Sequence, residues 1–163
     1  MRRVAVMIVG AVALGSGTTA TAKTSHAGWP VVDRHHTRID HSNSGVTYKG
    51  ARRAHNKLLG GHGSDRLKAG AIGDVLWGDF HPSGQSVTQS DRLMGGAGKD
   101  FIYAGHGRNV ITTGGGLDAV HAHYGFGSIT CANPKATIFL SHRSRKRYTL
   151  HGCPRISYKT VGH

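Results

Sequence analysis

A nine-residue repeat between Gly60 and Thr130 constrains this chain more than any other feature. The eighth position of every unit is aliphatic, and the same step reaches back to Leu58 and forward to Ile129 and Ile138. A repeat this short predicts stacked units that share one continuous core. The units are GGHGSDRLK, AGAIGDVLW, GGAGKDFIY, AGHGRNVIT and TGGGLDAVH, and their aliphatic positions are Leu67, Leu76, Ile102, Ile111 and Val120.

The glycine content favours such a stack over a conventional two-layer core. The chain has 25 glycines in 163 residues. Each glycine loses extra backbone entropy on folding and contributes no side chain to pack. A stacked repeat avoids this problem because it buries one aliphatic residue per short strand in a single column. We therefore expect an all-β solenoid.

Acidic residues follow the repeat. The chain has 8 acidic residues, all Asp, against 21 Lys and Arg, and its formal net charge is +13. Two positions before the aliphatic residue the repeat places an Asp or an Asn, so both side chains point to the same side of a short strand. The glycines allow sharp turns that aim backbone carbonyls inward. Calcium prefers six to eight oxygen ligands, and this pattern supplies carboxylates and carbonyls.

GGHGSDRLK and GGAGKDFIY closely resemble the RTX, or haemolysin-type, calcium-binding repeat, and TGGGLDAVH resembles it well. The longer run from GDVLWGDFHPSGQ to GCPRISYKT is similar to small secreted repeat proteins of high-GC actinobacteria. The resemblance implies a parallel β-roll with two nonapeptides per turn and calcium held between successive turns.

The resemblance also implies the ligands of the metal. One edge of the roll would hold Asp65, Asp91 and Asn109, and the other would hold Asn56, Asp74, Asp100 and Asp118. The glycines of the metal-binding turns would be Gly60, Gly61, Gly63, Gly95, Gly96, Gly98, Gly105 and Gly107.

Departures from the pattern predict fewer and weaker sites than in a typical RTX protein. The two Asn bring no charge, and Gly127 and Ala136 stand where Asp is expected. A positive field also opposes cation binding. We expect affinities of about 10⁻⁴–10⁻³ M, the range of extracellular modules. In the alternative interpretation, the Asp and Asn side chains only hydrogen-bond turn amides, without metal.

The chain divides into four segments. Residues 1–22 have the basic start, apolar run and A-x-A site of a secretory signal peptide, which predicts a secreted protein with no membrane span after cleavage. Residues 23–54 form a polar lead and cap, in which Val46 to Tyr48 is expected to be a short strand. Residues 55–130 form the roll, with an insertion at 78–90 that delays Leu93 by eight residues, and residues 131–163 form a C-terminal cap.

The insertion contains a Pro82-Ser83-Gly84 turn and is flanked by Trp77 and Phe80. We expect either a tolerated bulge with aromatic side chains packed over the roll or a loop that contacts a partner. Asp79 lies off the repeat register and is not counted as a ligand.

Two further features lie outside the repeat. Cys131 and Cys153 are the only cysteines in a chain with export features, which predicts a disulfide that fastens the cap. The basic run Arg143, Arg145, Lys146 and Arg147 is either a solvated surface or a site for nucleic acid or an anionic cell-wall polymer.

No motif predicts catalysis. Ser83 and Ser86 lack a nucleophile setting, and the chain has no room for a separate catalytic domain. We therefore expect a calcium-binding protein that is not an enzyme. His121 and His123 are interpreted as surface histidines, with zinc binding as the alternative.

Overall fold

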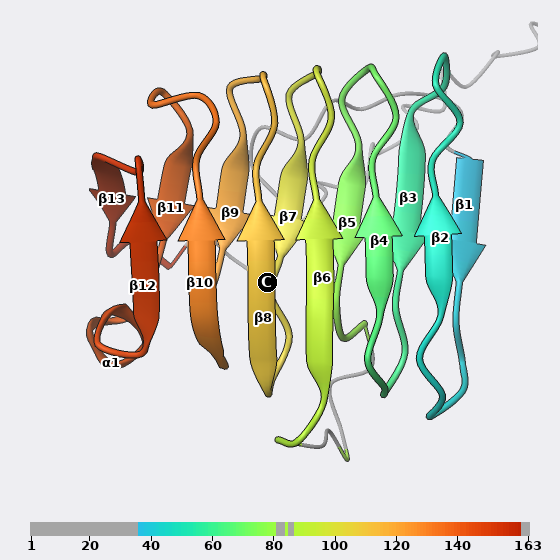
Figure 1. Ribbon diagram of the computed structural model, residues 1–163, viewed down its shortest axis with the longest axis horizontal. Helices are drawn as coiled ribbons and strands as arrows, with labels where there is room; N and C mark the ends of the chain where they lie inside the picture. The colour runs from blue at the N-terminus through green and yellow to red at the C-terminus, as the bar shows by residue number, and fades with distance from the viewer. Residues whose placement is uncertain (1–35, 81–83, 85–86, 161–163) are drawn as a thin grey trace, which may run out of the picture.

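The computed structural model describes residues 36–80, 84 and 87–160. Two parallel sheets face each other and are linked by turns at their upper and lower edges (Figure 1). The seven-stranded sheet consists of β1 (His36–Ile39), β3 (Asn56–Leu59), β5 (Val75–Trp77), β7 (Phe101–Tyr103), β9 (Ala119–His121), β11 (Thr137–Phe139) and β13 (Arg155–Ser157). The six-stranded sheet consists of β2 (Thr47–Lys49), β4 (Arg66–Lys68), β6 (Ser90–Met94), β8 (Arg108–Thr112), β10 (Phe126–Thr130) and β12 (Tyr148–His151).

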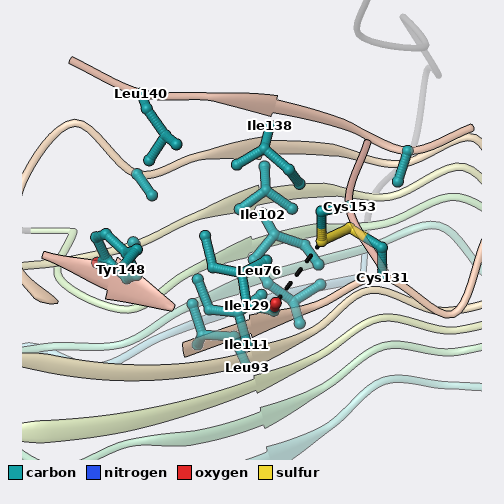
Figure 2. Packing of buried hydrophobic residues seen from close by; sticks show 14 of the residues in the cluster. Leu76, Leu93, Ile102, Ile111, Ile129, Cys131, Ile138, Leu140, Tyr148 and Cys153 are labelled. Atoms are coloured by element: carbon teal, nitrogen blue, oxygen red, sulfur yellow. Dashed lines mark hydrogen bonds between the residues drawn. A yellow bond between two sulfur atoms is a disulfide. The ribbon is translucent and has the colours of Figure 1, made fainter. Parts of the chain in front are cut away.

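The aliphatic register forms the core, as the repeat predicts. In the strand Arg66–Lys68 only the central Leu67 points inward, while both neighbours are exposed. Parallel pairing places each aliphatic residue beside its equivalent in the next coil, as with Leu93 and Ile111. The column between the sheets is at most 1% exposed along its whole length (Figure 2), and it consists of Leu58, Leu67, Leu76, Leu93, Ile102, Ile111, Val120, Ile129 and Ile138. The predicted parallel β-roll is confirmed.

The insertion leaves the stacking intact. β4 pairs with β6 and β5 pairs with β7 across it, without a change of register. The Phe80 ring packs edge-on against Trp77, with ring centroids 5.8 Å apart. Residues 81–83 and 85–86 lie outside the described part of the chain, so a contact of this loop with a partner stays a prediction.

The roll extends beyond the predicted repeat at both ends. The predicted strand at Val46 to Tyr48 corresponds to β2, but β1 was not predicted. All four residues of β1 are exposed, and the strand is held by its pairing with β3, so it carries no hydrophobic signal. β11, β12 and β13 continue both sheets into the predicted cap. The predicted signal peptide lies outside the described residues.

The C-terminal end is fastened covalently. The predicted disulfide between Cys131 and Cys153 is present and joins the segments that follow β10 and β12, two adjacent strands (Figure 2). In the chain, α1 (His142–Arg145) lies between β11 and β12. It is a single turn whose N-cap residue, Ser141, accepts a hydrogen bond from the backbone N–H of Ser144. No helix in the described part of the chain has the length and apolar content to cross a membrane.

Truncation of the column tests this assignment of the core. Replacing Ile111 with Ala should lower the free energy of unfolding by about 2–5 kcal/mol, because a cavity is left in a close-packed interior. Replacing its exposed neighbour Thr112 with Ala should change it by about 0.5 kcal/mol or less. Denaturant unfolding in calcium measures both values, and equal losses would contradict the assignment.

Candidate metal centre

The register brings the predicted Asp and Asn side chains together in two rows, one at each edge of the roll. The upper ladder precedes or begins strands of the seven-stranded sheet, and the lower ladder does so in the six-stranded sheet (Figure 1). Each side chain is at most 1% exposed. This division is the one that the resemblance to RTX repeats implies, with Asn56, Asp74, Asp100 and Asp118 in the upper ladder and Asp65, Asp91 and Asn109 in the lower ladder.

Hydrogen bonds link successive coils along the upper ladder. The backbone N–H of Asp74 donates to Oδ1 of Asp100 at 2.8 Å, and the backbone N–H of Asp100 donates to Oδ1 of Asp118 at 2.8 Å. The second carboxylate oxygen of Asp74 and of Asp100 accepts from a turn glycine, as when Gly96 N–H donates to Oδ2 of Asp100 at 2.6 Å. Oδ2 of Asp118 is buried and has no hydrogen-bond partner. The carboxylates of Asp74 and Asp100 therefore tie each coil both to its neighbour and to its own turn.

The lower ladder uses only half of its carboxylate oxygens in this way. Asp65 Oδ1 accepts from the backbone N–H of Val46 at 2.8 Å, and Asp91 Oδ1 accepts from the backbone N–H of Asp65 at 2.9 Å. The Oδ2 atoms of Asp65 and Asp91 are buried and have no hydrogen-bond partner. A buried anionic oxygen without a partner is costly, and a bound cation would remove that cost.

Gly60 keeps this part of the lower ladder open. A Cβ atom at Gly60 would collide with Oδ2 of Asp65 and with the carbonyl oxygen of Gly78 in the next coil. A carboxylate and a backbone carbonyl from successive coils therefore approach the same backbone position. Oxygen ligands of these two kinds suit calcium. The predicted turn role of Gly60 fits this geometry.

The two Asn residues make contacts that Asp cannot make. Nδ2 of Asn109 donates to the carbonyl oxygen of Gly105 at 3.0 Å and to that of Gly107 at 3.4 Å. Nδ2 of Asn56 likewise donates to the carbonyl oxygens of Ala51 and Ala54. A carboxylate has no proton to donate, so in an Asp coil such carbonyls are left for a cation. The geometry thus favours Asp over Asn as the metal ligand, and a ligand role for Asn56 and Asn109 stays a prediction.

Burial governs the electrostatics of both ladders. It raises the pKa of Asp91 to about 8, that of Asp100 to about 7 and that of Asp65 to about 6, against an ordinary value of 3.8. Burial also raises the pKa of Asp118. Desolvation is the largest cause at all four residues. Backbone N–H donors lower each of these pKa values. Neighbouring carboxylates raise the pKa of Asp91, Asp100 and Asp65 further, but not that of Asp118. A positive ion at these positions would favour the charged form.

Asp79 is a buried acid that the sequence analysis did not count. Its backbone position corresponds to the second glycine of a repeat, because Gly78 N–H bonds to Tyr103 as Gly60 N–H bonds to Trp77. The side chain is 3% exposed and accepts a hydrogen bond from Nε2 of Gln89, at the other end of the insertion. Asp79 and Gln89 therefore join the two ends of the insertion. The sequence signal that could have identified this buried acid is the Asp at position 79, where the repeat places glycine.

The other candidate metal ligands are arranged differently. Among the described residues, no three His, Cys, Asp or Glu side chains form a group that could hold a metal. Each nonapeptide offers at most one carboxylate, and backbone carbonyls would have to complete a site. We expected His121 to be a surface residue, and this expectation is wrong. His121 is 8% exposed and stacks between Tyr103 and Phe139 with centroid distances of 4.7 Å.

The basic run lies at the lower edge of the last coil. Arg143 and Arg145 belong to α1, and Lys146 and Arg147 follow it. All are exposed except Arg145, which is half-buried. The guanidinium of Arg147 lies over the ring of Phe126, 5.5 Å from its centroid.

Comparison with known families agrees with this geometry. Residues 88–120 match the family model of the RTX calcium-binding nonapeptide repeat in four copies. RTX nonapeptide repeats bind calcium. The matched stretch contains Asp91, Asp100, Asn109 and Asp118, and the structure extends the same two ladders to Asp65 and Asp74. No curated protein and no solved structure is similar enough to this chain to match it.

Without calcium, protonation of the ladders should stabilise the fold. The folded-state pKa values of Asp91, Asp100 and Asp65 lie above the unfolded value of about 3.9, so the folded protein binds more protons. This stabilisation is complete below the unfolded pKa and is lost as pH rises through the folded values. In chelator, the free energy of unfolding should therefore fall between about pH 5 and pH 8.5.

Denaturant unfolding at a series of pH values measures this dependence. The Asp91→Asn variant, which keeps every histidine, is the control and should show a shallower slope. A free energy that rises with pH in chelator would contradict the account.

Proposed function

We propose that this chain, whose residues 88–120 are RTX repeats, is an exported protein in which calcium stabilises the β-roll, with a structural or interaction role and no catalytic one. The observation that carries the proposal is the pair of buried Oδ2 atoms of Asp65 and Asp91 that have no hydrogen-bond partner. Calcium bound beside them would neutralise carboxylates that burial has removed from water.

The Asp residues would share the metal with the turns. Asp65 and Asp91 would hold calcium at the lower edge, and Asp74, Asp100 and Asp118 would do so at the upper edge. In the upper ladder both oxygens of Asp100 already accept backbone N–H groups, so calcium would have to share this carboxylate with those donors. The unpartnered Oδ2 atoms of Asp65 and Asp91 in the lower ladder and of Asp118 in the upper ladder need no such rearrangement, and we therefore assign the tighter sites to these three residues.

The expected gain in stability is modest for one site and considerable for several. With calcium between one and ten times the dissociation constant, each site stabilises the folded state by about 0.4–1.4 kcal/mol. Domains are stable by only about 5–15 kcal/mol, so several such sites would determine whether the roll is folded. Binding and folding would then be coupled.

Export is supported by two features of the chain. The Cys131–Cys153 disulfide is of a kind that persists in oxidising compartments. The first 22 residues have the layout of a signal peptide. N-terminal sequencing of the mature protein tests this part of the proposal, which predicts a start after Ala22.

A second function is favoured by the distribution of charge. Every described Asp is buried, whereas every described Lys and Arg is exposed or half-buried. Among the described residues, acidic side chains thus lie inside the roll and basic side chains lie on its surface. Clustered bases bind polymers that carry many negative charges. We propose that the roll also binds an anionic polymer. The sequence predicts Arg143, Arg145, Lys146 and Arg147 as a site for it.

Calorimetric titration with calcium tests the first function. The Asp91→Asn variant should bind fewer calcium ions than the wild type, although its amide oxygen can still accept the Asp65 N–H. Asn109→Asp should bind more, because it removes the amide that satisfies the turn carbonyls. Thr112→Asp adds the same charge at an exposed position and should leave the stoichiometry unchanged. Identical stoichiometry in all four proteins, or no heat at millimolar calcium, would refute these sites.

A further inference from the structure

The outward face of the six-stranded sheet carries a row of basic side chains, here called the basic stripe. Register pairs Lys49 with Lys68 and Arg66 with Arg92 on adjacent strands. Arg108 lies two residues nearer the start of its strand than the position that pairs with Arg92, and it is beside Ser90 and Phe126. Arg147 comes directly before Tyr148, which pairs with Gly127, and its guanidinium covers Phe126. The stripe consists of Lys49, Lys68, Arg66, Arg92, Arg108 and Arg147.

The stripe runs diagonally across the sheet. It begins at the last residue of β2 and of β4, moves to the first residue of β4 and the middle of β6, and continues through the first residue of β8 to the start of β12 (Figure 1). Adjacent strands lie about 4.8 Å apart, so the stripe spans about 24 Å across the six strands of the sheet. Each strand contributes at most two basic side chains to it, and β10 contributes none. This shape fits a linear ligand better than a globular one.

The positive charge of the stripe is not balanced by acidic side chains of the described residues on the same surface. All six side chains are exposed, and neighbouring members repel one another because they carry the same charge. The acids of the same sheet, Asp65 and Asp91, point inward from alternate positions of these strands and are buried. A bound polyanion would replace this repulsion by attraction. Arg is also well suited to phosphate because its planar guanidinium donates two parallel hydrogen bonds.

We propose that the basic stripe binds a linear phosphodiester polymer without bases, of the poly(glycerol phosphate) kind. Single-stranded nucleic acid is usually bound through aromatic side chains on which bases stack. The one aromatic ring on the stripe is Phe126, and Arg147 already covers it. The inference rests on the second function proposed above. It moves the main site from the cap, where the sequence predicts it, to the sheet, and only Arg147 belongs to both.

Binding of labelled poly(glycerol phosphate), followed by fluorescence anisotropy over a range of salt, tests the proposal. The full mature protein is used, oxidised and with calcium. Three triple variants remove the same charge: Arg66→Gln, Arg92→Gln and Arg108→Gln in the stripe; Arg143→Gln, Arg145→Gln and Lys146→Gln in the cap; and Arg52→Gln, Arg53→Gln and Lys135→Gln in exposed turns. Circular dichroism confirms that each variant is folded.

The stripe variant should bind at least about tenfold more weakly at about 0.1 M salt. Its slope of log affinity against log salt should be shallower by about 2. The other two variants should lose less than about threefold. Equal losses in all three variants would show a diffuse effect of net charge and overturn the stripe, and a loss confined to the cap variant would overturn it in favour of α1.

Two further results separate the occupant from the function. Tighter binding of oligo(dT) of matched charge than of poly(glycerol phosphate) would overturn the base-free ligand. No salt-dependent binding of poly(glycerol phosphate), oligo(dT) or heparin by the wild type would overturn the second function itself, and the stripe with it.

Discussion

The whole structure depends on burying one Asp or Asn side chain at each of the two edges of every repeat coil. Asp65, Asp91, Asp74, Asp100 and Asp118 are at most 1% exposed, and their Oδ1 atoms accept the N–H of a neighbouring coil. These bonds set the spacing and register with which the aliphatic column stacks. They also concentrate desolvated carboxylates, which raises the pKa of Asp91 to about 8. Because burial disfavours the charged form, a proton or a bound cation at the buried carboxylates of Asp65, Asp91, Asp100 and Asp118 would stabilise the aligned coils.

The separation of charge connects the interior with the surface. Because the acids are used up inside the roll, the described outer surface carries only positive charge. Calcium in the ladders would make the protein still more positive, which opposes its own binding but strengthens attraction to a polyanion. A polyanion on the basic stripe would in turn lower the positive potential near the ladders. The two proposed ligands should then favour each other's binding, as linkage requires.

The aliphatic core could be predicted from the strict periodicity of the repeat. The division of acids between two edges was implied by the resemblance to RTX repeats, and the disulfide was predicted from a pair of cysteines. The parts that were missed depend on contacts without a periodic signal. β1 is held by backbone pairing, and His121 is buried by stacking on Tyr103 and Phe139. The amide of Asn109 is distinguished from a carboxylate only by the carbonyls that it meets. Asp79 is buried because an insertion places it in a glycine position.

The most direct test of the account is circular dichroism of the mature, oxidised protein during a calcium titration, with magnesium as the control. Magnesium demands a tighter octahedral geometry and gives up its water reluctantly, so turns built of carbonyls and single carboxylates should select calcium. The account predicts a cooperative gain of β signal, or of thermal stability, with calcium alone. A β signal and a melting temperature that are the same in chelator and in millimolar calcium would contradict it.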